Sequence, residues 1–290
     1  MNSDVDLACR AARSCGIDAE VVGSESLGGG CIADVRRITF ADGVSVVLKV
    51  QPDPGRAEEE ARGLKAIHST ETIPVPAVRG TDHELLILEY LPTHSPLANE
   101  WERFGVNLAA LHHWDAGSRY GSDHDNHLGD THQSNEFHDD WVEFNRTCRI
   151  GWMRNKLADR SLADAHELRQ LDRLLDGLDA LLPRQPRPSL IHGDLWSGNA
   201  LPAEGRGIAV IDPAVSIGDG LADIAMMQLF GGFPESCHEA YRDAARDLFE
   251  IGKVEERLAV YRLYHLLNHW LLFGRSYAGQ ALSVVNALVG

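Results

Sequence analysis

The stretch Ile191-His192-Gly193-Asp194-Leu195-Trp196-Ser197-Gly198-Asn199, followed by Ile211-Asp212-Pro213, decides how this chain folds. Asp194 and Asn199 are five residues apart, and Asp212 follows Asn199 by thirteen. A carboxylate can take a proton from a reacting group, and carboxylate and amide oxygens are ligands that Mg²⁺ prefers. The stretch therefore contains a candidate base and two candidate metal ligands.

The same spacing is found in protein kinases, whose catalytic loop H-R-D-x-x-x-x-N is followed by a magnesium-binding D-F-G segment. It predicts phosphoryl transfer from ATP. Asp194 would receive the proton of the acceptor hydroxyl, while Asn199 and Asp212 would hold Mg²⁺. We expect His192 to hold the loop in shape rather than to carry a proton.

A glycine-rich segment near the N-terminus fits G-x-G-x-x-G-x-V, except that Ala33 replaces the third glycine. Glycines allow backbone N–H groups to approach phosphate oxygens closely. A flexible hairpin turn is the alternative reading. The cysteine of the segment is either redox-sensitive or a small structural residue. The predicted phosphate-contacting residues are Gly28, Gly29, Gly30 and Cys31.

Lys49 ends the β-branched run Val46-Val47-Leu48-Lys49, which is equivalent to the V-A-I-K strand of kinases. The lysine of that strand contacts the α and β phosphates and pairs with a helix carboxylate. The helix-forming stretch 56–68 offers Glu60 as this partner, since Leu64 lies near the same helix face.

Two further assignments depend on chain order. Asp223 begins an apolar helix, and we expect its carboxylate to bind backbone N–H groups of the catalytic loop, with substrate binding as the alternative. Glu89, Tyr90 and Leu91 follow a buried strand at the expected boundary of the lobes, and we expect them to offer backbone groups to adenine.

The predicted fold is α+β and protein-kinase-like, with two lobes. Strand signals around 21–22, 38–40, 44–50 and 85–88 predict an N-terminal lobe with an antiparallel sheet, residues 1–91. The proline-containing segment 91–96 is the expected boundary. Residues 92–290 would form a larger, mostly helical lobe, apart from short strands within 189–212. A short helix is expected at 4–15.

The polar stretch 119–145 is the expected acceptor side of the site. It contains a polar cluster of His124, His127, His132, His138, Asp123, Asp125 and Asp130. The spacing of these residues matches no zinc motif, so a substrate-facing loop is preferred to a transition-metal site. The candidate acceptor-contacting residues are Trp196, Asp125, Asn126, Asn135 and Trp141.

Composition limits the partners. The 290 residues carry 27 basic and 43 acidic side chains, a formal charge of −16, which disfavours nucleic-acid binding. Five cysteines without C-x-x-C spacing do not indicate a disulfide framework. Without a secretory signal pattern or a long apolar run, we expect a cytoplasmic protein with no membrane partner, and favour a monomer.

Over nearly its whole length the chain resembles the fructosamine kinase family, the fructosamine-3-kinase and ketosamine-3-kinase relatives within the aminoglycoside and choline phosphotransferase superfamily. Further segments carry the resemblance: Ile211-Asp212-Pro213-Ala214, Leu229-Phe230-Gly231-Gly232-Phe233 and 261–269. It implies transfer of the ATP γ-phosphate to the sugar 3-hydroxyl of a small or protein-bound ketosamine, a deglycation reaction.

One segment departs from the family pattern. Gly218-Asp219-Gly220-Leu221-Ala222-Asp223 stands where the family has Gly-His/Asp-Arg-Glu-x-Asp, so Gly220 and Leu221 replace an Arg-Glu pair. The acceptor therefore stays open. An aminoglycoside- or choline-type phosphotransferase is the first alternative, and a non-catalytic pseudokinase is the second.

Overall fold

The computed structural model describes residues 16, 20–28, 34–51 and 53–290. The chain divides into two compact units, Met1–Glu100 with Gly198–Pro213, and Trp101–Ser197 with Ala214–Gly290. The expected helix at 4–15 and the glycine-loop residues Gly29, Gly30 and Cys31 lie outside the described residues. The division at 91/92 stays a prediction, and the segment 198–213 is grouped with the first unit.

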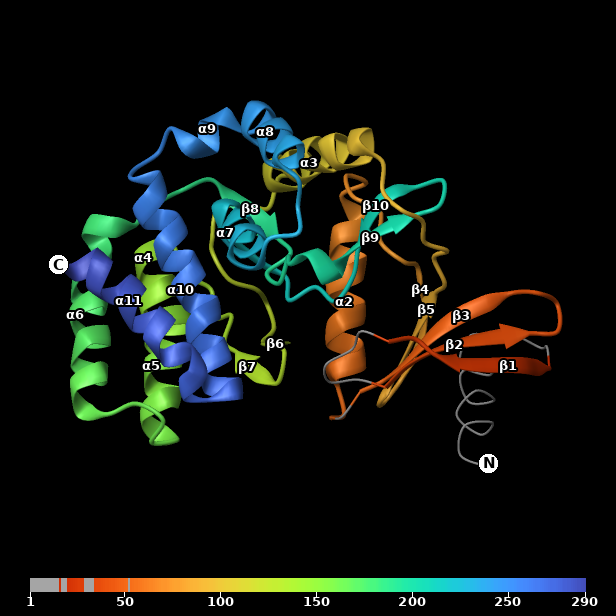
Figure 1. Cartoon of the computed structure of the whole chain (residues 1–290), viewed down its shortest axis with the longest axis horizontal. Helices are drawn as coiled ribbons and strands as arrows, with labels where there is room; N and C mark the ends of the chain where they lie inside the picture. Colours follow the sequence, from red (N-terminus) through yellow and green to blue (C-terminus); the bar gives the residue numbers. More distant parts are fainter. Residues whose placement is uncertain (1–15, 17–19, 29–33, 52) are drawn as a thin grey trace. The chain divides into compact units, whose positions relative to one another are not determined.

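The first unit is built on a five-stranded antiparallel sheet in the order β1-β2-β3-β5-β4. Its strands, labelled in Figure 1, are β1 Val21–Ser26, β2 Asp34–Phe40, β3 Ser45–Val50, β4 Val78–Asp82 and β5 Leu85–Glu89. A turn at 41–43 joins β2 to β3, and β4 was not predicted from the sequence. One face of β2, β3 and β5 forms a buried core of Ile38, Phe40, Val46, Leu48, Leu85 and Ile87.

Helix α2, Arg56–Ser69, follows β3 in the first unit. Its buried positions Ala57, Ala61, Leu64 and Ile67 recur every three or four residues, so they form one apolar stripe. The hairpin of β9 Ala200–Ala203 and β10 Gly207–Val210 completes the unit. A backbone bond of 2.9 Å from Val210 N–H to the Pro74 carbonyl ties β10 to the segment before β4.

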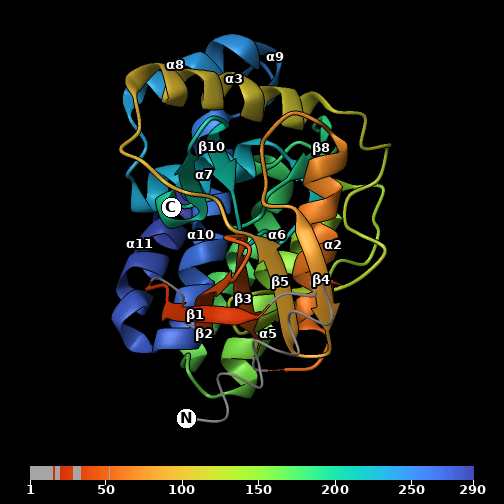
Figure 2. The same ribbon diagram turned by 90° about the vertical axis from the view of Figure 1, so that its right-hand side faces the viewer.

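The second unit is mostly helical. Its longest helix, α10, contacts α5, α7 and α11, as Figures 1 and 2 show. The helices are α3 Ala98–His113, α4 Trp141–Phe144, α5 Ile150–Asp159, α6 Ala165–Leu181, α7 Leu221–Phe230, α8 Glu235–Ala244, α9 Arg246–Phe249, α10 Val254–Phe273 and α11 Ala278–Val289. A short 3-10 turn occurs at Arg275–Tyr277, and another, Ser197–Asn199, begins at the last residue of a second-unit segment and continues into the first-unit segment 198–213.

Two strand pairs also belong to the second unit. β8 Pro188–Ile191 pairs with β11 Ser216–Asp219, and β8 leads directly into the catalytic loop. β6 Asn126–Leu128 pairs with β7 Thr131–Gln133, so the polar stretch predicted as a loop contains a hairpin. A π-helical turn, Asn145–Arg149, lies between α4 and α5.

A glycine makes the π-helical turn possible. A Cβ placed on Gly151 would lie 1.9 Å from the carbonyl oxygen of Arg146, so no other residue fits this backbone without a shift. Such turns inside α-helices are found frequently at functional sites. The turn ends on Arg149, whose side chain is buried.

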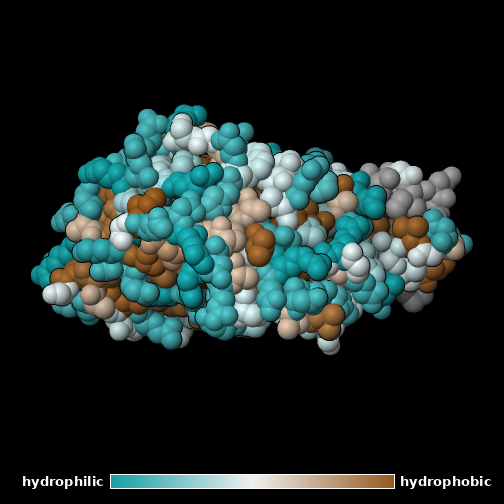
Figure 3. All heavy atoms as spheres, turned by 90° about the horizontal axis from the view of Figure 1, so that it is seen from above, coloured by the Kyte–Doolittle hydropathy of each residue, from teal (hydrophilic) through white to brown (hydrophobic). Residues whose placement is uncertain are grey.

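The surface in Figure 3 is mostly hydrophilic, and the apolar residues on this face stand in separate groups. Such scattered apolar surface is ordinary in folded proteins. Within the described residues, no helix is long and apolar enough to span a membrane.

Candidate active site

Lys49 is the centre of a buried charge cluster in the first unit. Its Nζ lies 2.8 Å from both carboxylate oxygens of Glu60 and 2.6 Å from Oδ1 of Asp212. The expected pairing of the strand lysine with Glu60 is therefore confirmed. Gln51, which directly follows β3, donates its side-chain amide N–H to Glu60 Oε2 at 2.8 Å. Nothing in the sequence indicated this second donor.

The cluster holds one cation against two carboxylates. Burial raises the pKa of Glu60 to about 7, and the charge of Asp212 adds to the rise, although Lys49 opposes it. Burial alone would lower the pKa of Lys49, but Asp212 and Glu60 outweigh it, so the pKa is raised and the amine stays protonated.

Asp212 has a backbone conformation that side chains rarely adopt. Its φ is 55°, and its side chain is 40% exposed, in contrast to the buried Lys49. Strained backbone of this kind costs about 1–3 kcal/mol and is concentrated at functional sites. Asn199 is buried, and its carbonyl accepts the N–H of Ile211 at 3.1 Å, so the two candidate metal-binding segments are joined by backbone.

The segment proposed for adenine binding ends β5. The backbone N–H of Glu89 donates a hydrogen bond to the Ala77 carbonyl at 2.8 Å. The Glu89 carboxylate accepts hydrogen bonds from the Ala77 N–H and from both terminal nitrogens of Arg206. The N–H of Leu91 has no hydrogen-bond partner within the described part of the chain.

The catalytic loop is shaped by a glycine. Gly193 has a φ of 82°, and a Cβ there would lie 2.2 Å from the carbonyl oxygen of Ala214. The N–H of Ala214 in turn donates to the His192 carbonyl at 2.9 Å. The loop therefore packs tightly against the segment after Pro213, and only glycine fits position 193.

Asp223 holds the same loop from α7. Its Oδ2 accepts the N–H of His192 at 2.7 Å, and its Oδ1 accepts the N–H of Gly193 at 2.9 Å. The expectation that this carboxylate binds catalytic-loop amides is confirmed. Burial would raise the pKa of Asp223, but the hydrogen bond and charge of His112 and the contacts of His192 outweigh it, so the pKa is lowered.

His112 is a partner of Asp223 that sequence reasoning missed. Its Nε2 lies 3.1 Å from Asp223 Oδ2, its Nδ1 lies 2.7 Å from the hydroxyl of Tyr241, and the side chain is fully buried. A Cβ on Gly220 would be 2.7 Å from His112 Nδ1. The imidazole thus occupies the space beside Gly220, which gives a structural reason for the missing arginine of the family pattern. Leu221 is fully buried.

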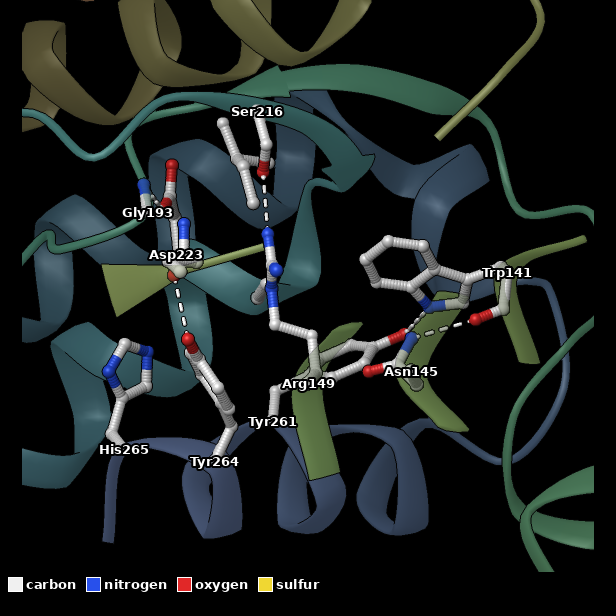
Figure 4. Close-up of a pocket in the computed structure, with 12 residues that line it drawn as sticks. Trp141, Asn145, Arg149, Gly193, Ser216, Asp223, Tyr261, Tyr264 and His265 are labelled. Atoms are coloured by element: carbon white, nitrogen blue, oxygen red, sulfur yellow. Dashed lines mark hydrogen bonds between the residues drawn. The ribbon is translucent and has the colours of Figure 1, made fainter. Parts of the chain in front are cut away.

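A pocket in the second unit adjoins the loop (Figure 4). Its lining includes two residues of the clamp just described, Gly193 and Asp223, and side chains from the 133–149 region and α10. The lining residues are Gln133, Trp141, Asn145, Arg149, Ile191, Gly193, Ser216, Ala222, Asp223, Tyr261, Tyr264 and His265.

The predicted acceptor-contacting residues differ in where they lie. Trp141 lines the pocket but is 2% exposed, and its indole N–H donates to the hydroxyl of Tyr261 at 2.8 Å. Asn126 and Asn135 are buried and bond to each other at 2.9 Å. The Asn135 N–H donates to Asp125 at 2.8 Å.

The catalytic-loop residues predicted to act on the acceptor are less buried than those polar side chains. Asp194 and Trp196 are partly buried, and the N–H of Trp196 lies 3.1 Å from the Asp194 carbonyl. The charge of Asp194 also contributes to a raised pKa of Tyr264, about 12, after burial as the main cause.

A buried ion pair supports the pocket from behind. Asp219 accepts from Arg257 at 2.6 Å and from the hydroxyl of Tyr261 at 2.5 Å, and all three side chains are buried. Because Tyr261 also accepts from Trp141, the chain of contacts runs from Arg257 to the pocket wall. The residues of this network are far apart in the sequence, so no local sequence pattern predicted it.

The fold and the loop define a protein-kinase-like phosphotransferase. Solved structures agree: a Thermobifida fusca protein assigned as a fructosamine-3-kinase is 31% identical, covers 98% of this chain and 99% of its own, and has a TM-score of 0.86. An aminoglycoside phosphotransferase APH(4)-Ia complex with ADP and hygromycin B shares the fold alone, with a TM-score of 0.64, 16% identity and 98% coverage of both chains.

The sequence comparison is more specific. Residues 7–290 match the fructosamine kinase family, to which this chain belongs. The probable ketoamine kinase VP1481 of Vibrio parahaemolyticus is 39% identical over 80% of both chains. The chloroplastic protein-ribulosamine 3-kinase of Arabidopsis thaliana is 33% identical over 90% of this chain and 81% of its own. The protein is thus a kinase, and its family uses ATP as the phosphoryl donor.

Proposed function

We propose that this protein transfers the γ-phosphate of ATP, with Mg²⁺, to the sugar 3-hydroxyl of a ketosamine, in a deglycation reaction. The observation that carries the proposal is the similarity to the Arabidopsis protein-ribulosamine 3-kinase over 90% of this chain. That relative is a ribulosamine 3-kinase, which indicates both the acceptor class and the hydroxyl that is phosphorylated. The proposed acceptor is a free or protein-bound ketosamine, and the proposed setting is a cytoplasmic monomer.

For the nucleotide, the proposed contacts lie in the first unit. Lys49, held by Glu60, would bind the α and β phosphates, and the glycine loop Gly28, Gly29, Gly30 and Cys31 would offer backbone amides. At the end of β5, the Leu91 N–H without a partner in the described chain supports a hydrogen bond to adenine, with the Glu89 carbonyl as the second contact.

For the metal, the proposed ligands are Asn199 and Asp212. Mg²⁺ commonly takes one or two protein oxygens and completes its shell with phosphates and waters, so this small oxygen donor set fits it. When bound, Mg²⁺ neutralises charge that develops on the phosphates. The exposed part of the Asp212 carboxylate supports this role, since Lys49 engages only Oδ1.

For the chemistry, Asp194 is the proposed base. The acceptor oxygen forms a bond to the γ-phosphorus as the bond from phosphorus to the β,γ-bridging oxygen breaks, ADP leaves, and the hydroxyl proton passes to Asp194. Such a reaction depends chiefly on position and charge, which is why a rigidly held loop matters. The clamp of Asp223 on Gly193 supports this requirement.

For the acceptor, we propose that Trp196 and Trp141 border the sugar and that Asp125, Asn126 and Asn135 shape the same region. The bonds among these polar residues support a shaping role for them rather than a mobile contact.

An acceptor panel tests the proposal. ADP release would be measured with a ribulosamine, a fructosamine, an aminoglycoside and choline, each at equal concentration. We expect ketosamines to be turned over with the highest kcat/KM, and the phosphorylated product to carry phosphate on the 3-hydroxyl by NMR. Higher kcat/KM for the aminoglycoside or choline would favour the other branch of the superfamily. If none of the four acceptors supports magnesium-dependent ADP release, the ketosamine assignment is contradicted.

A further inference from the structure

Arg149 is a buried cation in the pocket beside the catalytic loop, and its hydrogen bonds go to neutral groups. Nη1 donates to the carbonyls of Ser134 and Cys148 at 2.7 and 2.9 Å. Nη2 donates to Asn135 Oδ1 at 2.8 Å and to Ser216 Oγ at 3.3 Å, the latter drawn in Figure 4. Within the described chain, no carboxylate forms an ion pair with Arg149.

The guanidinium is also fixed by aromatic rings. Its Cζ lies 4.4 Å from the ring centroid of Phe144 and 5.5 Å from that of Tyr264. Burial lowers the pKa of Arg149, and Tyr264, Cys148 and Asp125 oppose the shift, with Asp125 the smallest of the three. The Asp125 carboxylate is itself engaged by the Asn135 N–H and by His132, so it does not neutralise the pocket.

A second polar side chain of the pocket, His265, has a ring nitrogen without a hydrogen-bond partner in the described part of the protein. This nitrogen, Nδ1, is buried, and the side chain is 4% exposed. Burial lowers the pKa of His265 to about 3, so the imidazole is neutral and can offer an N–H. An unpartnered buried polar atom costs about 1–3 kcal/mol, which a polar ligand would recover.

The remaining charge on the pocket wall is already compensated. The two carboxylate oxygens of Asp223 accept hydrogen bonds from the backbone N–H groups of His192 and Gly193, and Oδ2 also contacts His112. Tyr264 stays protonated and donates to Gln133 Oε1 at 2.7 Å. The pocket therefore offers a ligand the cation of Arg149, which has no carboxylate partner in the described chain, together with neutral donors. Gly193, which lines the pocket, is adjacent in sequence to Asp194.

We infer that this pocket binds a carboxylate of the acceptor, with Arg149 as its cation and His265 as a neutral donor. Guanidinium groups bind carboxylate and phosphate oxygens through charge-assisted hydrogen bonds, and Nε is the nitrogen of Arg149 that is not used in the bonds above. The inference rests on the proposed ketosamine kinase function and narrows it: the preferred acceptor is a ketosamine formed from an amino acid that keeps its free carboxylate.

The test uses wild-type protein and two acceptors that differ in one group. One is the ketosamine of glycine, and the other is the ketosamine of glycinamide. We expect roughly 10- to 100-fold lower kcat/KM for the amide, mostly through KM, because a charge-assisted hydrogen bond is lost in both ground and transition states. Equal kcat/KM for the two acceptors would overturn the inference while leaving the ketosamine kinase proposal intact.

Two variants sharpen the test. Arg149→Gln should remove the preference for the carboxylate, whereas Arg154→Gln, which removes an arginine of α5 paired with Asp172, should retain it. Thermal unfolding of both variants shows whether Arg149→Gln still folds, and if it does not, the wild-type comparison decides. If neither acceptor is phosphorylated, the proposed function fails. Calorimetric binding of the two compounds to wild-type protein then decides the inference separately, with equal affinity counting against it.

Discussion

Asp223 and His112 form a fully buried pair, with Nε2 of the histidine 3.1 Å from Oδ2 of the carboxylate. The next residue along the chain makes an exposed counterpart, since His113 Nε2 lies 2.9 Å from Asp247 Oδ1. Two adjacent histidines on α3 therefore pair with aspartates in opposite environments, and the buried pair is the one that holds the catalytic loop.

Removing the buried carboxylate should be far more damaging than removing the exposed one. Asp223→Ala leaves His112 and two loop amides without their acceptor, and breaking such a pair costs about 3–5 kcal/mol. Asp247→Ala should cost less than about 1 kcal/mol, as exposed pairs do. Urea unfolding of both variants measures the difference. Comparable losses in the two would mean that Asp223 does not carry the loop.

Position 220 should tolerate no side chain. Gly220→Ala places a Cβ 2.7 Å from His112 Nδ1, and we expect about 1–3 kcal/mol of destabilisation from the forced shift. Gly177→Ala, at a site in α6 where a Cβ meets nothing within 4 Å, should instead be stabilising by about 0.5–1 kcal/mol.

A double variant, His112→Ala with Gly220→Ala, tests whether the contact between these two positions causes the destabilisation. His112→Ala removes the two nearest ring atoms and leaves only its Cβ, 3.0 Å away, so adding Gly220→Ala to it should cost less than Gly220→Ala costs alone. Additive losses in thermal unfolding would show that the two positions act independently.

The charge cluster around Lys49 predicts a pH effect on stability. The pKa of Glu60 is raised to about 7 in the folded protein, above its ordinary value of 4.5, so the native state binds this proton more tightly than the unfolded chain. The contribution is fully present below pH 4.5 and is lost as pH rises through 7.

Glu60→Gln removes that titration. The free energy of unfolding of the wild type should fall relative to that of Glu60→Gln between pH 4.5 and 7, as measured by urea unfolding at a series of pH values. A difference between the two proteins that stays constant with pH would mean that the pKa of Glu60 is not raised, and one that moves the other way would mean that Lys49 outweighs burial at Glu60.

Much of the site follows from local pattern. The pairing of Lys49 with Glu60 was predictable because the kinase-type strand lysine needs a helix carboxylate and the helix pattern favours Glu60. The hydrogen bonds of Asp223 followed from its place at the start of an apolar helix. The overall class of fold came from the same alternation of strand and helix signals.

The rest depends on contacts between distant segments. His112 and Asp223 are 111 residues apart, and Arg206 and Glu89 are 117 apart, so no local pattern announces either pair. The β6–β7 hairpin was missed because its short strands are polar and contain histidines, and the strand propensity of such residues is weak. From the sequence, Gly220 was only a position where the arginine of the family pattern is missing, and the structure shows that His112 lies beside it.

The most direct test of the account is ADP release by Asp194→Asn with a ketosamine acceptor, at saturating ATP and Mg²⁺. The amide keeps the shape of the side chain but cannot take the hydroxyl proton, so we predict a fall in kcat of roughly 10²- to 10⁴-fold. Nucleotide affinity and thermal stability should stay close to those of the wild type. Undiminished turnover in Asp194→Asn would contradict the assignment of this residue as the base.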